Sequence, residues 1–418
     1  MNFQDFNIGG NIVSVFLGGS PIGDITAERI AKWYVDRENN LLDDVEKNWN
    51  GSFSVVIKDD LYITAFTDPH GVDQLYYTVP DRQAGYDKDR SGIQFARFIS
   101  ELPASGLDAQ YFSEVRKWGY NTDNRTPWQN IKRVMPGEVV VYDPTARWVY
   151  RSEAFAGYFT RPNNYIESQS YGETLRNLVH NAVQTRVQAL GEDVKTIAML
   201  LSGGLDSSCI AYELLGLQKA GLLGGRDLVF YTINNADDAP FVKEFADQFG
   251  IIVTTLSYDM DAVDLDNALR INETPVDLGS MVPNQCMFDV IPETVIFTGD
   301  GPDEMLGGYN RIDQYDSQLS DTFEELSFYH YPRLNKAAHH YGKTLVCPYT
   351  DREIVAFALA MPFSERTHKK VLKDAYRGLI PDSIIARQKL PLKNDELRKD
   401  PLAYRFKIAQ RFIDIYTK

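Results

Sequence analysis

The chain has 418 residues, of which 44% are hydrophobic and 24% are charged, so it is long enough for two folded domains and too apolar for wholesale disorder. Its formal net charge of -15 at pH 7 disfavours general nucleic-acid binding, which needs clustered Lys and Arg. Three scattered cysteines, no signal-peptide pattern and no apolar run of membrane-spanning length predict a cytoplasmic protein without a membrane partner.

The first 150 residues are predicted to be rich in β-structure. Short β-branched and aromatic runs at 53–57, 61–66 and 138–142 are separated by turn residues. Asp59 and Asp60 are typical of a hairpin turn between the first two runs. A polar stretch at 161–164 is interpreted as a linker, which predicts domains at 1–160 and 165–418.

From Ser168 onward the pattern changes to alternating helices and strands, which predicts an α/β fold with a parallel sheet. Apolar residues at helical spacing in 241–249 predict a crossover helix. Four continuous apolar runs have strand length, as expected where helices cover both faces of a sheet: 196–201, 228–233, 251–256 and 294–298.

A seven-residue loop, Ser202-Gly-Gly-Leu-Asp-Ser-Ser208, connects the first of these strands to a predicted helix at 209–215. A tight Gly-Gly turn, a helix N-terminus and serine hydroxyls together favour phosphate binding. The loop lacks the Gly-Lys-Ser/Thr ending of a P-loop. The carboxylate of Asp206 needs a cation beside phosphate, which predicts Mg²⁺. The alternative is a turn that only caps a helix.

This loop resembles the phosphate motif of the PP-loop ATP pyrophosphatases, an adenine nucleotide alpha hydrolase-like fold. A second segment, Gly-Asp-Gly-Pro-Asp-Glu-Met-Leu-Gly-Gly-Tyr-Asn-Arg at 299–311, is similar to a motif of asparagine synthetase-like enzymes. The resemblance implies cleavage of ATP to AMP and pyrophosphate during adenylation of a carboxylate. An acidic, glycine-rich loop at the edge of the sheet is the alternative for this segment.

The same resemblance implies roles for individual residues. Asp206 and Asp303 would hold Mg²⁺, and Asp300, Lys369 and Lys389 would be catalytic. The nucleotide would contact a larger set: Leu201, Ser202, Gly203, Gly204, Asp206, Ser207, Ser208, Thr232, Ile233, Gly299 and Gly301. A basic cluster would neutralise the phosphates: Arg366, Lys369, Lys370, Lys373, Arg387, Lys389 and Lys393.

Segments 50–54, 67–71 with 75–77, and 131–137 resemble the glutaminase domain of class B asparagine synthetases, which is of the N-terminal nucleophile (Ntn) type. That domain uses an N-terminal cysteine, whereas this chain begins Met1-Asn2-Phe3 and has no cysteine before Cys209. We therefore expect a degenerate glutaminase-like domain, as in β-lactam synthetase, carbapenam synthetase and lasso peptide cyclases. An unrelated β-rich domain is the alternative.

The combined prediction is an ATP-dependent ligase that forms an amide from a small-molecule carboxylate and an amine without glutamine hydrolysis. A homodimer is a candidate assembly. Asp300 stands where asparagine synthetases carry Glu, and Val346 where the family carries Arg, which indicates a pocket different from a standard aspartate site. Two alternatives remain open: an ammonia-dependent asparagine synthetase, and an ATP-binding pseudoenzyme or regulator, which the altered region around Asp300, Thr344 and Val346 favours.

Overall fold

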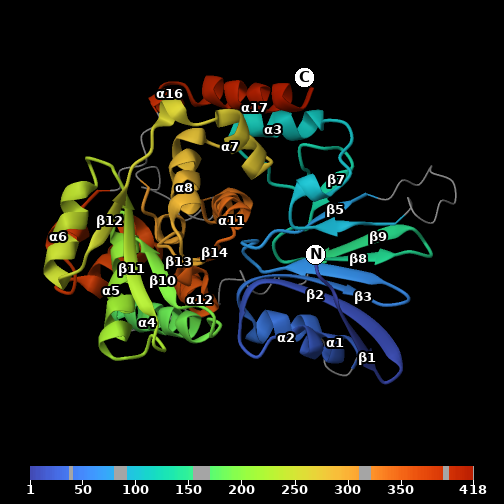
Figure 1. Ribbon diagram of the computed structural model, residues 1–418, viewed down its shortest axis with the longest axis horizontal. Coiled ribbons are helices and arrows are strands. Elements are labelled where there is room, and N and C mark those ends of the chain that lie inside the picture. The colour runs from blue at the N-terminus through green and yellow to red at the C-terminus, as the bar shows by residue number, and fades with distance from the viewer. Residues whose placement is uncertain (37–40, 80–91, 154–169, 310–321, 389–394, 418) are drawn as a thin grey trace.

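The structure, a computed structural model, describes residues 1–36, 41–79, 92–153, 170–309, 322–388 and 395–417 (Figure 1). The first part of the chain is built on a six-stranded antiparallel sheet of strand order β1-β2-β3-β4-β8-β9. Its strands are β1 (Gln4–Ile8), β2 (Asn11–Ile22), β3 (Asn50–Lys58), β4 (Ile63–Thr67), β8 (Glu138–Asp143) and β9 (Trp148–Glu153). A three-stranded sheet contains β5 (Tyr76–Thr78), β6 (Phe95–Ala96) and β7 (Ile131–Arg133).

The predicted hairpin joins β3 and β4. The carboxylate of Asp59 accepts hydrogen bonds from the backbone N–H groups of Leu61 and Tyr62, at 2.8 and 2.6 Å. These bonds close an Asx-type turn, which explains why β4 begins at Ile63 and not at Leu61 as the sequence pattern suggested.

The second part contains a five-stranded parallel sheet of order β12-β11-β10-β13-β14, which confirms the predicted fold class. Its strands are β10 (Thr196–Leu200), β11 (Asp227–Ile233), β12 (Val253–Leu256), β13 (Val295–Phe297) and β14 (Thr344–Val346). The first four correspond to the four predicted runs. The sequence pattern did not predict β14, which has only three residues.

Helices and short helical turns fill the rest of the described chain. Those before β10 are α1 (Ala27–Val35), α2 (Leu41–Asn48), η1 (Ile99–Glu101), α3 (Ala109–Trp118) and α4 (Tyr171–Gln188). Between β10 and β14 lie α5 (Leu205–Lys219), α6 (Ala239–Phe249), η3 (Met260–Ala262), α7 (Leu265–Asn272), α8 (Leu278–Val290), α9 (Pro302–Met305), the π-helical η4 (Leu326–His330) and α11 (Tyr331–His340). After β14 come η5 (Pro348–Thr350), α12 (Arg352–Ala360), α13 (Phe363–Arg366), η6 (Thr367–Lys369), α14 (Lys370–Tyr376), α15 (Asp382–Ala386), α16 (Asp395–Lys399) and α17 (Pro401–Thr417).

The strand order of the parallel sheet reverses at β10. From this strand the chain proceeds through α5 to β11 on one side, whereas β13 pairs with its other side. Helices α4 and α5 pack together, and α7, α8 and α11 form a second group (Figure 1). Ligands of open α/β sheets bind beside such a reversal, at the carboxyl ends of the strands. The loops after β10 and β13 meet there.

Helix α5 begins earlier than the sequence predicted. Gly204 is its N-cap, and the Ser208 N–H donates to the Gly204 carbonyl at 3.1 Å. Asp206, Ser207 and Ser208 therefore lie in the first helical turn, where the partial positive charge of the helix stabilises anions.

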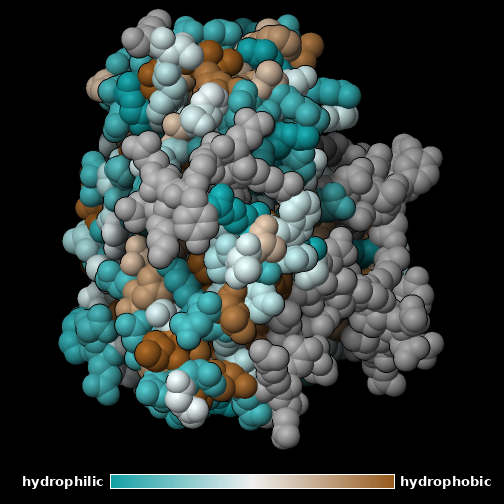
Figure 2. Space-filling view, turned by 90° about the vertical axis from the view of Figure 1, so that its right-hand side faces the viewer, coloured by the Kyte–Doolittle hydropathy of each residue, from teal (hydrophilic) through white to brown (hydrophobic). Residues whose placement is uncertain are grey.

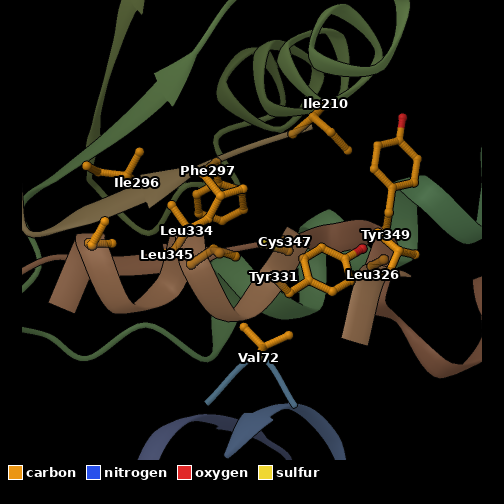
Figure 3. Packing of buried hydrophobic residues seen from close by; sticks show 14 of the residues in the cluster. Val72, Ile210, Ile296, Phe297, Leu326, Tyr331, Leu334, Leu345, Cys347 and Tyr349 are labelled. Carbon is orange, nitrogen blue, oxygen red and sulfur yellow. The ribbon is translucent and has the colours of Figure 1, made fainter. Parts of the chain in front are cut away.

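A continuous core joins the two parts of the chain. In Figure 3 Val72, from the first part, points toward a cluster that contains Tyr331, Leu345 and Cys347 of the second. Polar contacts add to this junction: the Asn50 side-chain amide donates to Asp351 at 2.8 Å, and Arg186 pairs with the same carboxylate at 2.8 Å. Because the two parts share this core, the division of the chain into domains at 1–160 and 165–418 stays a prediction.

Among the coloured, described residues on the face drawn in Figure 2, the hydrophobic side chains lie in small separate groups. Within the described ranges, each helix is too short or too polar to cross a bilayer.

Candidate active site

A cavity of about 1100 Å³ opens at the carboxyl ends of β10 and β13. The loops after these strands form one end of the cavity. The other end lies among α8, η4, α11, α17 and the last turn of α3. This volume is at the upper limit for a single small-molecule pocket, so the cavity has room for a nucleotide and a second substrate.

Most of the predicted nucleotide-binding residues line this cavity, and two do not. Those at the cavity wall are Leu201, Ser202, Gly204, Asp206, Ser207, Thr232, Ile233, Gly299 and Gly301. Gly203 is a buried residue of the loop, and its carbonyl accepts a hydrogen bond from the Arg387 guanidinium at 2.9 Å. Ser208 is fully buried on the inner side of α5. The geometry therefore does not support the predicted contacts of Gly203 and of the Ser208 side chain with the nucleotide.

The phosphate loop, residues 202–208, is closed by its own serines. The hydroxyl groups of Ser202 and Ser207 are 3.0 Å apart, and the Ser202 N–H donates to the Ser207 oxygen at 3.2 Å. Gly203 has a φ of +67°, and a side chain there would press against the start of α6. Glycine is thus required for the turn that brings the α5 N-terminus to the cavity.

The second loop packs directly on the first. A Cβ atom at Gly299 would lie only 2.5 Å from the backbone nitrogen of Ser207, so the close approach of the two loops needs glycine. Gly301 has a φ of +125° and caps the short helix α9. Asp303, in the first turn of α9, consequently faces Asp206 in the first turn of α5.

Lys369 lies between these two aspartates. Its ammonium nitrogen is 2.6 Å from Asp206 Oδ2 and 2.5 Å from Asp303 Oδ1. Lys369 and Asp303 are only 6% and 5% exposed. Residues far apart in the sequence thus form a buried acidic centre that holds one cation, and the hydroxyl of Tyr349 supports it by donating to the Asp206 carbonyl at 3.3 Å.

Asp300 lies at the cavity wall beside this centre. Its carboxylate accepts a short hydrogen bond from the Thr298 hydroxyl, and its carbonyl accepts one from Tyr331 at 3.3 Å. These contacts fix the loop that carries Asp300 at the cavity wall.

The predicted basic cluster is only partly brought together. Lys373 lines the cavity, and burial, aided by the neighbouring Lys369 charge, lowers the pKa of its ammonium. Arg387 lines it too, but pairs with Asp238 and stacks on Phe241. Lys370 is exposed and pairs with Glu365 at 2.8 Å, and Arg366 is buried away from the cavity wall. Lys389 and Lys393 lie outside the described residues.

Val346, which was predicted to alter the acceptor pocket, and Thr344, which belongs to the region that favours a pseudoenzyme, both lie elsewhere. Thr344 and Val346 are in β14, and they line a separate, smaller cavity against β2 and β3. The Val346 carbonyl accepts the Thr298 N–H at 3.0 Å. Val346 is therefore linked to the site through the backbone beside Asp300 and not through the cavity wall.

The far end of the cavity contains a polar group that the sequence did not reveal. The guanidinium of Arg333 donates to Ser280 and to the Tyr329 hydroxyl, both at 2.9 Å, and stacks 4.2 Å above the Tyr329 ring. Tyr329 in turn stacks on Tyr120, which follows α3. In the described ranges no carboxylate lies within ion-pair distance of Arg333, although Asp277 and Glu325 line the same cavity. Arg333 lies outside every motif from which the site was predicted, so no sequence signal pointed to it.

The sheet, its phosphate loop and the facing acidic centre define a nucleotide-binding protein of the PP-loop type. The Asparagine synthase family matches residues 174–345 and 326–407, more than half of the chain, and the chain belongs to this family. It is a family of ATP-dependent ligases that form amides.

Three relatives illustrate the similarity. A probable glutamine-hydrolyzing asparagine synthetase of Acanthamoeba polyphaga mimivirus is 25% identical over 394 residues, which cover 88% of this chain and 67% of the viral protein. "Amidase chry2" of Gibberella zeae is 25% identical, covering 62% of this chain and 40% of that protein. Glutamine-hydrolyzing asparagine synthetase 1 of Bacillus subtilis is 26% identical, with the same two coverages, 62% and 40%. The chain thus spans two fifths to two thirds of the length of these relatives.

Proposed function

We propose that this protein activates a small-molecule carboxylate with ATP and couples it to an amine, without hydrolysing glutamine. The observation that carries the proposal is the single cavity in which the phosphate loop, the acidic centre and Asp300 lie beside a second, polar subsite.

In the proposed reaction a carboxylate oxygen attacks the α-phosphorus of ATP, and pyrophosphate leaves. The amine nitrogen then attacks the acyl carbon, AMP leaves, and the nitrogen loses a proton. The backbone of residues 202–207 and the α5 N-terminus would bind the departing pyrophosphate. Asp300, which lines the same cavity, would orient the amine or accept its proton.

Asp206 and Asp303 fit a divalent cation. Hard cations such as Mg²⁺ take oxygen ligands, and both carboxylates already converge on one positive group. Bound there, Mg²⁺ would neutralise charge on the phosphates. We propose Lys389, outside the described residues, as a further catalytic cation, in line with the family resemblance.

The nitrogen source is proposed to be an amine or ammonia and not glutamine. The relatives from the mimivirus and B. subtilis are named glutamine-hydrolyzing. In this chain the first cysteine is Cys209, which is fully buried in α5, and burial raises the pKa of its thiol well above the usual range. The nucleophile of a glutaminase needs an accessible thiolate.

Arg333 favours an acid that carries a second anionic group. The guanidinium is fixed by Ser280 and the Tyr329 ring, and a fixed fork of donors suits a carboxylate. The reacting carboxylate would lie beside Asp300, and the second anion would lie against Arg333. Aspartate meets this description, so ammonia-dependent asparagine synthesis remains the second candidate.

The test is a mass spectrum of the protein incubated with ATP, Mg²⁺ and single acids, without an amine. The panel pairs aspartate, glutamate and succinate with matched acids that have one carboxyl group. We expect an acyl-adenylate from a member of the first group. An ATP-binding pseudoenzyme would give none, and an adenylate only from acids with one carboxyl group would contradict the role of Arg333.

A further inference from the structure

Lys369 is held in place by an unusual backbone. His368 and Lys369 both adopt left-handed conformations, with φ values of +56° and +55°. Two consecutive residues of this kind are rare outside glycine, and they persist only where the surroundings impose them. Here the N–H groups of His368 and Lys369 donate to the carbonyls of Gly307 and Leu306, both at 2.8 Å.

The segment that follows Asp303 is shaped to admit the Lys369 side chain. Gly308 lies so close that a Cβ atom there would overlap both Asp303 Oδ1 and Lys369 Cε. Gly308 and the left-handed residues 368–369 thus have the same effect. Together they allow the Lys369 ammonium group to lie between the two carboxylates.

That point is also where a metal held by both carboxylates would lie. The ammonium nitrogen is 2.6 and 2.5 Å from the two oxygens, whereas Mg²⁺ binds oxygen at about 2.0–2.1 Å. An ammonium group and a divalent cation cannot share this space, because their centres would nearly coincide and their charges repel. Binding of the metal by these oxygens requires the Lys369 side chain to move.

We propose that Lys369 and the metal exchange places. The ammonium holds Asp206 and Asp303 together until a metal arrives with its nucleotide. The displaced ammonium then turns to the phosphates, which its flexible four-carbon stem allows. Metal without nucleotide binds poorly, because it must displace the Lys369 ammonium group when no phosphate is present to bind that group. This inference rests on the proposed function.

The rival interpretation is a permanent ion pair. Lys369 would stay in place, and a metal would use other oxygens of the two carboxylates. Removing Lys369 would then let the carboxylates repel each other and would weaken the binding of metal and of pyrophosphate together.

The experiment measures Mn²⁺ binding by electron paramagnetic resonance, without nucleotide, in the wild-type chain, Lys369→Gln and Lys373→Gln. Lys373 lines the same cavity but does not lie between the aspartates, so it controls for the loss of one positive charge. Calorimetry with pyrophosphate and Mg²⁺ follows for the same variants. Lys369→Met, which keeps the apolar stem, replaces Lys369→Gln if thermal unfolding shows that the latter is not folded.

Opposite effects on the two ligands are the expected result. Lys369→Gln should bind Mn²⁺ about tenfold more tightly than the wild type and pyrophosphate about tenfold more weakly, within the range of typical coupling between sites. Lys373→Gln should tighten Mn²⁺ binding much less. Unchanged or weaker Mn²⁺ binding in Lys369→Gln, or equal tightening in Lys373→Gln, would overturn the exchange.

Binding of Mg²⁺ with a non-hydrolysable ATP analogue to the wild type distinguishes failure of the proposed function from failure of the proposed exchange. Failure of the wild type to bind this complex contradicts the proposed function. Normal binding of the complex, combined with unchanged Mn²⁺ affinity in Lys369→Gln, contradicts the exchange alone.

Discussion

Gly308 lies against both Asp303 and Lys369, and nothing larger than hydrogen fits on its Cα atom without moving them. We expect Gly308→Ala to cost about 1–3 kcal/mol of stability through overpacking. It should also weaken the binding of pyrophosphate with Mg²⁺, because the acidic centre is displaced. Titration calorimetry measures the binding, and chemical denaturation measures the stability.

Gly216 provides the control for this substitution. It lies in α5, where an added Cβ atom would meet no heavy atom within 4 Å apart from its chain neighbours and the backbone of its own helix. Gly216→Ala should therefore stabilise the helix by about 0.5–1 kcal/mol and leave the binding of pyrophosphate unchanged. Equal binding losses in the two variants would show that the contacts of Gly308 are unimportant.

Residues of the nucleotide end could be predicted because they occur in contiguous motifs. Ser202, Asp206 and Asp303 each belong to a short segment whose chemistry can be inferred from the sequence before the fold is known. Arg333 and Tyr329 could not be found in this way. Single polar residues on a helix are usually solvated, and only packing against α8 and α3 shows that these two face a cavity.

At the scale of elements, α11 serves both parts of the chain. Arg333 faces the cavity, whereas Lys336 is buried and pairs with Glu273 at 2.8 Å. His339, near the end of the helix, lies beside Arg97 and within 3.7 Å of Asp73, both from the first part of the chain. The same helix thus carries the proposed substrate subsite and a junction between the two parts.

His339 makes this junction sensitive to acid. Burial lowers the pKa of its imidazole to about 4; Asp73 opposes the shift and Arg97 adds to it. The unfolded chain, with an ordinary pKa near 6.5, binds the proton first as the pH falls. Stability is therefore lost between about pH 6.5 and 4, by on the order of 3 kcal/mol from this residue.

We expect His339→Gln to lose less stability than the wild type over this pH range, as measured by urea denaturation at several pH values. His340→Gln is the matched control, because the neighbouring side chain is exposed. A pH profile of His339→Gln parallel to that of the wild type would contradict the assignment.

Element predictions succeeded where the pattern was long or the turn was specific, as for α6 and the hairpin at Asp59. They failed at short elements. β14 has three residues, and its place is set by pairing with β13 and not by its own sequence. The start of α5 was misplaced because Gly204, a poor helix former, serves here as a cap.

At the scale of the whole molecule, the two parts share one core. Helix α3 packs on α17, although nearly 300 residues separate them, and the Arg405 side chain donates to the Lys117 carbonyl at 2.7 Å. The sequence indicated a β-rich part followed by an α/β part, but long-range packing of this kind leaves no local pattern.

Differential scanning calorimetry should therefore show one cooperative unfolding transition for the full chain. Contacts such as those of Asn50 with Asp351 and of Val72 with the core must break together with the parallel sheet. Two separate transitions, one for each part, would contradict a shared core and support independent domains at 1–160 and 165–418.

The account as a whole depends on cleavage of ATP at the α-phosphorus. The most direct measurement is to incubate the protein with ATP labelled at the α-phosphorus, Mg²⁺, an acid from the panel and an amine, and to separate the labelled products. We predict labelled AMP together with unlabelled pyrophosphate, formed only when the acid is present. Labelled ADP as the sole nucleotide product would contradict the proposed function.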